Sequence, residues 1–250
     1  MCCFTGPVVS VRNTCIFARQ TPHGRQYVVY AMSIETKHDL AMVLPLPVAP
    51  GEGDDRLKFI NLEGYGEFFD EMEGGFIDSS ANPFGAAASA KSVAPVLAVQ
   101  NVGAYEASFV PTVADFSRLD RRFRLPKGAV EKLPGYAGFG FAVFKLRKAD
   151  GPVHPMAFSF LSAVPDRLFF PTLHIHDGEV HPKAEFDHTL YCQGTGLNHR
   201  EWKESPGVAS QFFKADRAKG TVMPHEHVYR MELKGELANT DWLVKARAVA

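Results

Sequence analysis

No pair of cysteines in this sequence has the spacing of a zinc ribbon or a thioredoxin-like redox site. The 250-residue chain contains four cysteines, and none belongs to a CxxC motif. Phosphate-binding loops, dinucleotide fingerprints and the Gly-x-Ser-x-Gly elbow of serine hydrolases are absent as well. The sequence therefore excludes the most recognisable nucleotide-binding and hydrolytic sites.

The sequence also lacks a large net charge and a long apolar run. A formal net charge of -1 gives no electrostatic reason to expect nucleic acid or a membrane surface as a partner. No apolar stretch approaches the ~20 residues that span a bilayer, and the first residues lack the pattern of a signal peptide. We therefore expect a cytoplasmic protein whose cysteines are thiols or metal ligands.

Composition and periodicity predict an α+β fold in one domain spanning residues 1–250. The chain is 46% hydrophobic and 22% charged, which is ordinary for a globular protein. We expect a β-rich chain of mainly antiparallel sheets with helices at the periphery. The stretch from Gly74 to Ala94 is rich in Gly, Ala and Ser and is expected to form a long loop or lid.

Alternation with a period of two predicts the strands, and spacings of three and four predict the helices. The principal expected strands are Thr14–Arg19, Gln26–Glu35, Met42–Val48, Val96–Asn101, Tyr105–Val110, Phe139–Arg147, His154–Leu161, Leu168–His176, Phe186–Cys192 and Leu243–Val249. The expected helices are Phe59–Met72, Thr112–Phe123, Lys127–Leu133 and Gly207–Ala218.

Two histidine pairs are the most informative feature. His174 and His176 alternate along one predicted strand, and His225 and His227 do the same along another. Two imidazoles at positions i and i+2 lie on the same face of a strand and can give a metal two ligands. A single histidine is usually a packed or surface residue, but two such pairs support a metal site.

The amino-terminal cysteine provides a further candidate ligand. Removal of Met1 would leave Cys2 with a free amine beside its thiol. Thiolate and imidazole together suit copper, zinc or iron better than magnesium or calcium. Cys2 and Cys3 are equally well explained as small buried residues at the start of a strand.

These residues lead to the first functional hypothesis, a copper-dependent oxidoreductase, with iron or zinc as alternative metals. His174, His176, Cys2, His225 and His227 would be the ligands, with His188 and Cys192 as further candidates. Cys2 and Tyr30 are the candidate catalytic residues, and Tyr191 and Tyr229 could also serve as radical or proton partners. The substrate would be an unidentified small molecule.

Two alternatives belong to other classes. In an N-terminal-nucleophile amidohydrolase, Cys2 would attack an amide with its own amine as base, and Arg19 or Asn101 would bind the substrate or form an oxyanion hole. In a non-catalytic module, the same ligands would bind a metal without turnover.

The first two-thirds of the chain resembles an uncharacterised bacterial family, a domain of unknown function. Similar features are the Pro-Val segment after Cys2-Cys3-Phe4, the extended segment 42–48, the stretch 102–107 and the strand 136–146. Typical members are secreted and begin near Cys-Gly-Gly-Phe-Phe-Cys after signal removal, whereas this chain begins with adjacent cysteines. The resemblance implies a recurring N-terminal cysteine but no activity.

Overall fold

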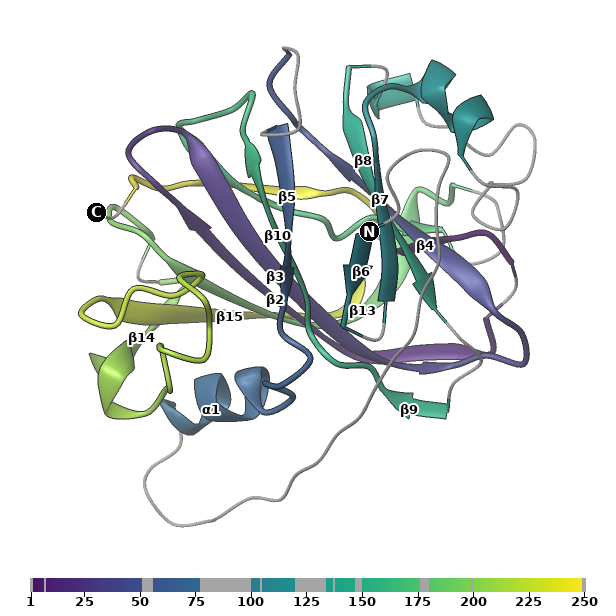
Figure 1. The fold of residues 1–250 in the computed structure, drawn as a ribbon. Coiled ribbons are helices and arrows are strands. Elements are labelled where there is room, and N and C mark those ends of the chain that lie inside the picture. Colours follow the sequence, from purple (N-terminus) through teal and green to yellow (C-terminus); the bar gives the residue numbers. More distant parts are fainter. Residues whose placement is uncertain are drawn as a thin grey trace.

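A computed structural model of the chain describes residues 2–6, 8–50, 56–76, 100–103, 105–119, 134–136, 138–146, 150–175, 180–198 and 200–248. Most of the described strands lie in two large β-sheets (Figure 1). A third, two-stranded sheet pairs β11 (Arg167–Phe170) with β16 (Trp242–Lys245). The predicted loop or lid at Gly74–Ala94 falls largely outside the described residues.

The six-stranded sheet places the first strand of the chain in its interior. Its order is β12 (His174–Ile175), β1 (Cys2–Phe4), β4 (Leu40–Leu46), β8 (Gly140–Leu146), β7 (Tyr105–Val110) and β6 (Gln100–Val102). Pro45 lacks the N–H that a sheet ladder needs. The sheet tolerates Pro45 because β1 pairs with β4 only at Met42 and Val43. In the described part of the chain, no strand pairs with that edge of β4 at Pro45.

The eight-stranded sheet is built around a long hairpin. Its path is β14 (Lys203–Val208), β15 (His227–Ala238), β13 (Lys183–Gln193), β2 (Ser10–Gln20), β3 (Arg25–Glu35), β10 (Met156–Leu161) and β5 (Leu57–Asn61), with β9 (Asp150–Pro152) added to β3. The predicted strands near residues 14–19 and 26–35 are confirmed as β2 and β3. The contact between β13 and β2 is parallel, and their neighbours in the sheet are antiparallel.

The main core lies between the two large sheets. Phe144 of β8 is fully buried, and its ring lies 5.4 Å from Phe59 of β5 and 6.0 Å from Phe158 of β10. Alternating inward side chains of both sheets therefore interdigitate, as in a β-sandwich. Tyr30 of β3 belongs to the same core and is fully buried there.

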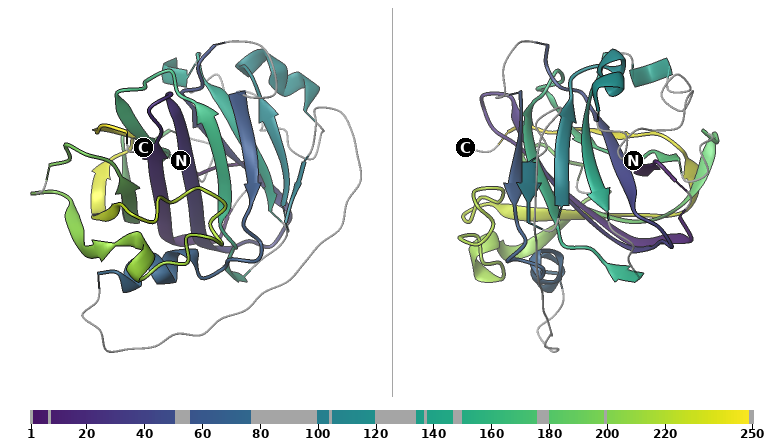
Figure 2. Two further views of the ribbon diagram at one scale, coloured as in Figure 1. Left: turned by 60° about the vertical axis from the view of Figure 1, so that its left-hand side comes forward. Right: turned by 45° about the vertical axis from the view of Figure 1, so that its right-hand side comes forward.

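Helical structure covers the outside but is scarce. The described residues contain one α-helix, α1 (Phe68–Gly74), and short 3₁₀ turns at Val113–Arg118, Pro134–Tyr136 and Ala209–Gln211. Figure 2 shows α1 and the segment 209–222 on the same side of the eight-stranded sheet, where they form a second core. None of the described helices has the length and apolar character that a bilayer crossing requires.

The predicted α+β class with peripheral helices is therefore wrong, because the fold is mostly β. The expected helix at Phe59–Met72 is strand β5 followed by a turn and the short α1. The expected helix at Gly207–Ala218 is a 3₁₀ turn and irregular chain. The expected helix at Thr112–Phe123 is a 3₁₀ turn over Val113–Arg118 where it is described, and Lys127–Leu133 lies outside the described residues.

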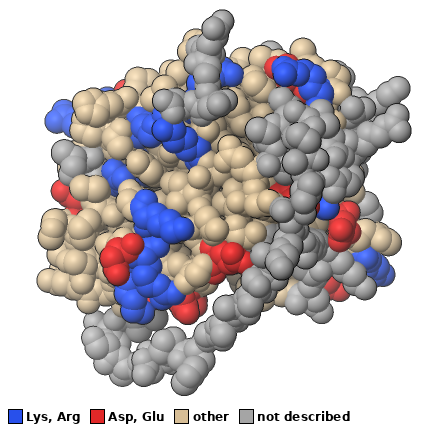
Figure 3. Space-filling model, viewed as in Figure 1, with Lys and Arg blue, Asp and Glu red and all other residues tan. Residues whose placement is uncertain are grey.

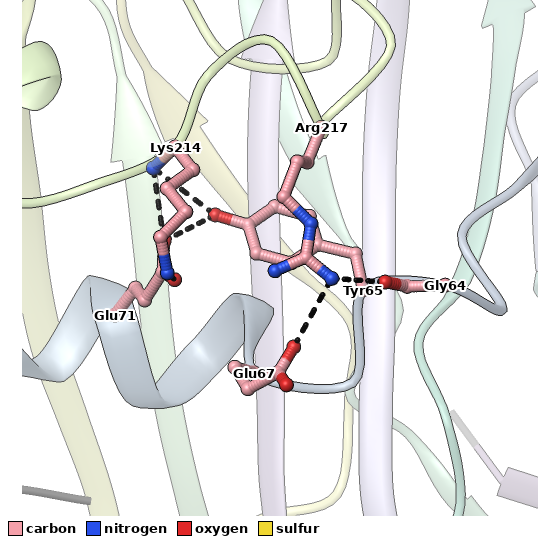
Figure 4. A network of polar contacts seen from close by, with 6 residues as sticks. All are labelled: Gly64, Tyr65, Glu67, Glu71, Lys214 and Arg217. Atoms are coloured by element: carbon pink, nitrogen blue, oxygen red, sulfur yellow. Dashed lines mark hydrogen bonds and ion pairs between the residues drawn. The ribbon is translucent and has the colours of Figure 1, made fainter. Parts of the chain in front are cut away.

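A polar network joins α1 and the turn before it to the segment 214–217 (Figure 4). The Lys214 backbone N–H donates to Glu71 Oε2 at 2.9 Å, and Tyr65 Oη donates to the same oxygen at 2.5 Å. Arg217 lies over the Tyr65 ring and donates to the Gly64 carbonyl. Burial alone would raise the pKa of Glu71, but the hydrogen bonds from Lys214 and Tyr65 outweigh it and lower that pKa.

Candidate functional site

A cavity of about 510 Å³ lies where β2 and β13 separate. The two strands pair from Thr14 and His188 onward. Before that point, within the described residues, β2 pairs only with β3 and β13 pairs only with β15. The cavity is lined by residues of both separated stretches and by His174, His181 and Asn239.

A bulge in β2 produces the separation. The pairing of β2 with β3 shifts register between Arg12 and Cys15, and Asn13 adopts a φ of 53°. Asparagine tolerates this left-handed conformation better than most residues, which suits it to a bulge. The Asn13 backbone N–H points across to β13 and donates to Asp187 Oδ2 at 2.6 Å.

Two imidazoles meet at the closed end of the cavity, which is the end where β2 and β13 begin to pair at Thr14 and His188. The Nε2 atoms of His174 and His188 lie 3.1 Å apart, so one ring donates a hydrogen bond and the other accepts it. Phe186 stacks on His174 with ring centroids 4.5 Å apart. This pair links β12 of one sheet to β13 of the other.

Two buried polar atoms at this end find no hydrogen-bond partner among the described residues. Thr14 Oγ1 and His188 Nδ1 belong to side chains that are only 1% exposed, and both residues line the cavity. The carboxylate oxygen that approaches Nδ1, Asp187 Oδ1, is 3.7 Å away and too far for a hydrogen bond. Unpaired buried polar groups are costly, so a bound group that satisfied both atoms would gain affinity.

Burial and charge set the protonation states here. Burial lowers the pKa of His188, although Asp187 opposes the effect. Burial alone would raise the pKa of Asp187, but its interactions with His188 and the Asn13 backbone N–H lower it. At neutral pH the cavity therefore holds a neutral imidazole beside a carboxylate.

Acidification is expected to destabilise the protein through His188. Its pKa in the folded state lies below the ordinary 6.5, so the unfolded chain takes up the proton first. The free energy of unfolding should fall as the pH drops through 6.5, by up to about 1.4 kcal/mol per pH unit, and level off below the folded pKa.

Urea unfolding between about pH 5 and 8 measures this effect. His188→Gln should flatten the profile, whereas His225→Gln, at an exposed position, should leave it unchanged. Burial also lowers the pKa of His154, which contributes in the same direction to every variant. An unaltered profile in His188→Gln would assign the effect elsewhere.

The structure brings two of the predicted metal ligands, Cys2 and His174, onto neighbouring strands. β1 pairs in parallel with β12, and the backbones of Cys2 and His174 are register partners. His176 lies outside the described residues. His188, a further candidate ligand, does meet His174, and no motif in the sequence identifies that pairing.

The second histidine pair lies elsewhere. His225 is exposed, and His227 Nδ1 lies 2.8 Å from the Ser205 carbonyl oxygen. Leu233 is the β15 residue opposite His188. Because each strand residue advances the chain by about 3.3 Å, His227 lies ~20 Å along β15 from the cavity. His227 therefore does not converge with His174 at the cavity.

The other candidate residues are placed apart from the cavity's closed end. Cys192 is fully buried, and burial raises the pKa of its thiol. Burial, with nearby Glu73, raises the pKa of Cys15 to about 12, so neither thiol is poised to react. Arg19 points to the carbonyls of Gly220 and Thr221, and Asn101 lies in the edge strand β6.

The tyrosine candidates are held in packing or polar contacts. Tyr30 is enclosed between the sheets. Tyr191 Oη donates to Glu73 Oε2 at 2.5 Å, and burial raises the pKa of this phenol. Burial likewise raises the pKa of Tyr229 to about 12. None of these three lines the cavity in the described part of the structure.

Comparison with known proteins gives a fold but no family. No family model and no curated protein matches the sequence. The crystal structure of baculovirus P35 is similar, with a TM-score of 0.50 and 12% identity, covering 97% of this chain and all of P35. The structure of the caspase-8/P35 complex matches with a TM-score of 0.48 and 10% identity, covering 94% of this chain and 96% of that one.

These findings correct the functional hypotheses. Among the described residues, no group of three or more His, Cys, Asp or Glu side chains could hold a metal ion. The structural similarity leads to P35 rather than to an oxidoreductase, so the copper-dependent oxidoreductase and its metal-binding and amidohydrolase alternatives are not retained. The expected small-molecule substrate is not retained either, because it belonged to the oxidoreductase hypothesis.

Proposed function

We propose that this chain is a protein-binding module whose partner is a caspase-type cysteine protease. One observation carries the proposal: the fold resembles P35 over nearly the whole of both chains. P35 itself has been crystallised in a complex with caspase-8. Identity of 12% transfers no individual contact, so the proposal concerns the class of partner and not the residues that bind it.

The described surface supports a protein partner because it is held rigid by polar contacts. Arg230 Nε lies 3.2 Å from Glu73 Oε2, and the Lys203 ammonium group donates to the Phe76 carbonyl at 3.4 Å. Together with the network of Figure 4, these contacts hold the chain as far as Phe76, the last residue described before the gap that begins at residue 77. A preorganised surface loses less conformational freedom on binding, which favours affinity.

The charge distribution favours a specific partner over a polyelectrolyte. On the face shown in Figure 3, basic and acidic side chains lie side by side and leave a wide uncharged region between them. Ion pairs among the described residues include those of Arg217 with Glu67 and of Arg230 with Glu73. Mixed, paired charges around an uncharged area are typical of protein interfaces with a polar rim.

Size-exclusion chromatography with purified caspase-8 tests the proposal. A stable complex is expected at about 10 μM of each protein. A papain-type cysteine protease, which shares the nucleophile but has a different sequence signature, is the matched control and should elute separately. Equal binding to both proteases, or no complex with caspase-8 or other caspase-type proteases, would contradict the proposal.

A further inference from the structure

The separated stretches of β2 and β13 each present an unpaired strand edge to the cavity. Ser10–Arg12 pairs on one side only, with β3, and Lys183–Asp187 pairs on one side only, with β15, within the described chain. Both stretches line the same cavity. Among the residues that the structure describes, their cavity-facing backbone groups have no strand partner, and such groups are a template for an added strand.

The two faces of this opening differ in character. On the inner face, Val11 and Ala184 pack against the main core, and Phe186 is buried in it. On the outer face, Arg12, Lys183 and Asp187 have side chains that are 66%, 62% and 44% exposed. A strand placed here would meet apolar side chains on one face and charges of both signs on the other.

The closed end of the opening adds a polar requirement. Thr14 Oγ1 and His188 Nδ1 are buried there, and no described residue offers either atom a hydrogen bond. Thr14 and His188 are also the first register pair of β2 and β13, so they mark where the sheet closes.

We propose that the opening between β2 and β13 binds an extended peptide segment of another protein as an added strand. The segment would be about four residues long, the length over which both edges are free. Its side chains would alternate, with apolar residues toward Val11, Ala184 and Phe186 and polar or charged residues toward Arg12, Lys183 and Asp187. This site is independent of any protease partner.

A synthetic peptide provides the probe. We would use acetyl-Val-Lys-Ile-Ser-Val-Glu-amide, which alternates apolar and polar residues, and follow amide hydrogen exchange of the intact chain. Saturating peptide should slow exchange about tenfold within Ser10–Arg12 and Lys183–Asp187, where main-chain donors gain partners. The central amides of β4, which β8 already pairs, should not change.

Two control peptides separate strand addition from nonspecific adhesion. The same peptide N-methylated at its three apolar residues keeps every side chain but loses backbone donors, and it should give no protection. A peptide of the same composition with its apolar residues adjacent should also fail. Protection by either control, or none from the alternating peptide at about 2 mM, would overturn the proposal.

Matched substitutions locate the site. Ala184→Glu places a charge on the inner face of the opening and should weaken binding of the alternating peptide about tenfold or more. Glu185→Gln changes the adjacent, exposed residue and should alter binding by less than about threefold. Both positions lie near the start of β13, and thermal unfolding checks that both variants remain folded. Equal effects in the two variants would place the peptide elsewhere.

Discussion

Phe144→Ala is expected to lower the free energy of unfolding by about 3–5 kcal/mol. Phe144 is fully buried in β8 of the six-stranded sheet. Its ring contacts Phe59 and Phe158 of the opposite sheet, and it lies 6.0 Å from Tyr105 on the neighbouring strand. Truncation therefore removes apolar contacts to both sheets and leaves a cavity that rigid strands cannot close.

Urea unfolding monitored by circular dichroism measures this loss. Leu243→Ala is the control, because that side chain is 46% exposed and its removal should cost less than about 0.5 kcal/mol. A loss below about 1 kcal/mol for Phe144→Ala would mean that the two sheets do not share the core described above.

Arg19→Ala is expected to lower the free energy of unfolding by about 3–5 kcal/mol. This loss is large for a residue whose described hydrogen-bond acceptors are carbonyls and not carboxylates. Arg19 is only 4% exposed, and its Nε and Nη2 donate to the carbonyls of Thr221 and Gly220 at 2.9 and 2.8 Å. The guanidinium group also lies 4.6 Å from the centre of the Tyr27 ring. Its removal would leave both carbonyls without their charged donor.

Arg19→Lys separates charge from geometry. Lysine keeps the positive charge but lacks the planar fork that reaches two carbonyls, so we expect roughly half of the loss to remain. Thermal and urea unfolding of both variants, with the half-buried Arg25→Ala as a control, give the comparison. A fully stable Arg19→Ala would show that the segment 220–221 is held by other contacts.

The strands were more predictable than the helices, for a reason visible in two segments. In 59–72, apolar residues recur at helical spacing, but the segment is a strand, a turn and then α1. In 207–218, Ala209, Phe213 and Ala218 are buried on the sheet by an irregular chain that keeps a helix-like spacing of buried positions. The spacing of apolar residues indicates which positions are buried. Tertiary packing determines whether a helix, a strand or an irregular backbone buries them.

The candidate site was predictable only within single strands. Alternation correctly places His174 opposite to Leu173 and Ile175, which face another core. The expected single strand 168–176 is wrong, because the structure forms two strands there, β11 and β12, in different sheets. The meeting of His174 with His188 depends on how two sheets pack, which no local pattern encodes. The bulge at Asn13 was likewise missed, although an asparagine within a strand pattern is a signal for one.

The position of β2 has a consequence for synthesis of the chain. Its partner β13 begins to pair with it 174 residues later, as the contact between Asn13 and Asp187 illustrates. At about 5–20 residues per second, a ribosome needs on the order of 10–30 seconds to make that stretch. During this time the hairpin of β2 and β3 has an apolar strand with an open edge, so the nascent hairpin is a natural client for a chaperone.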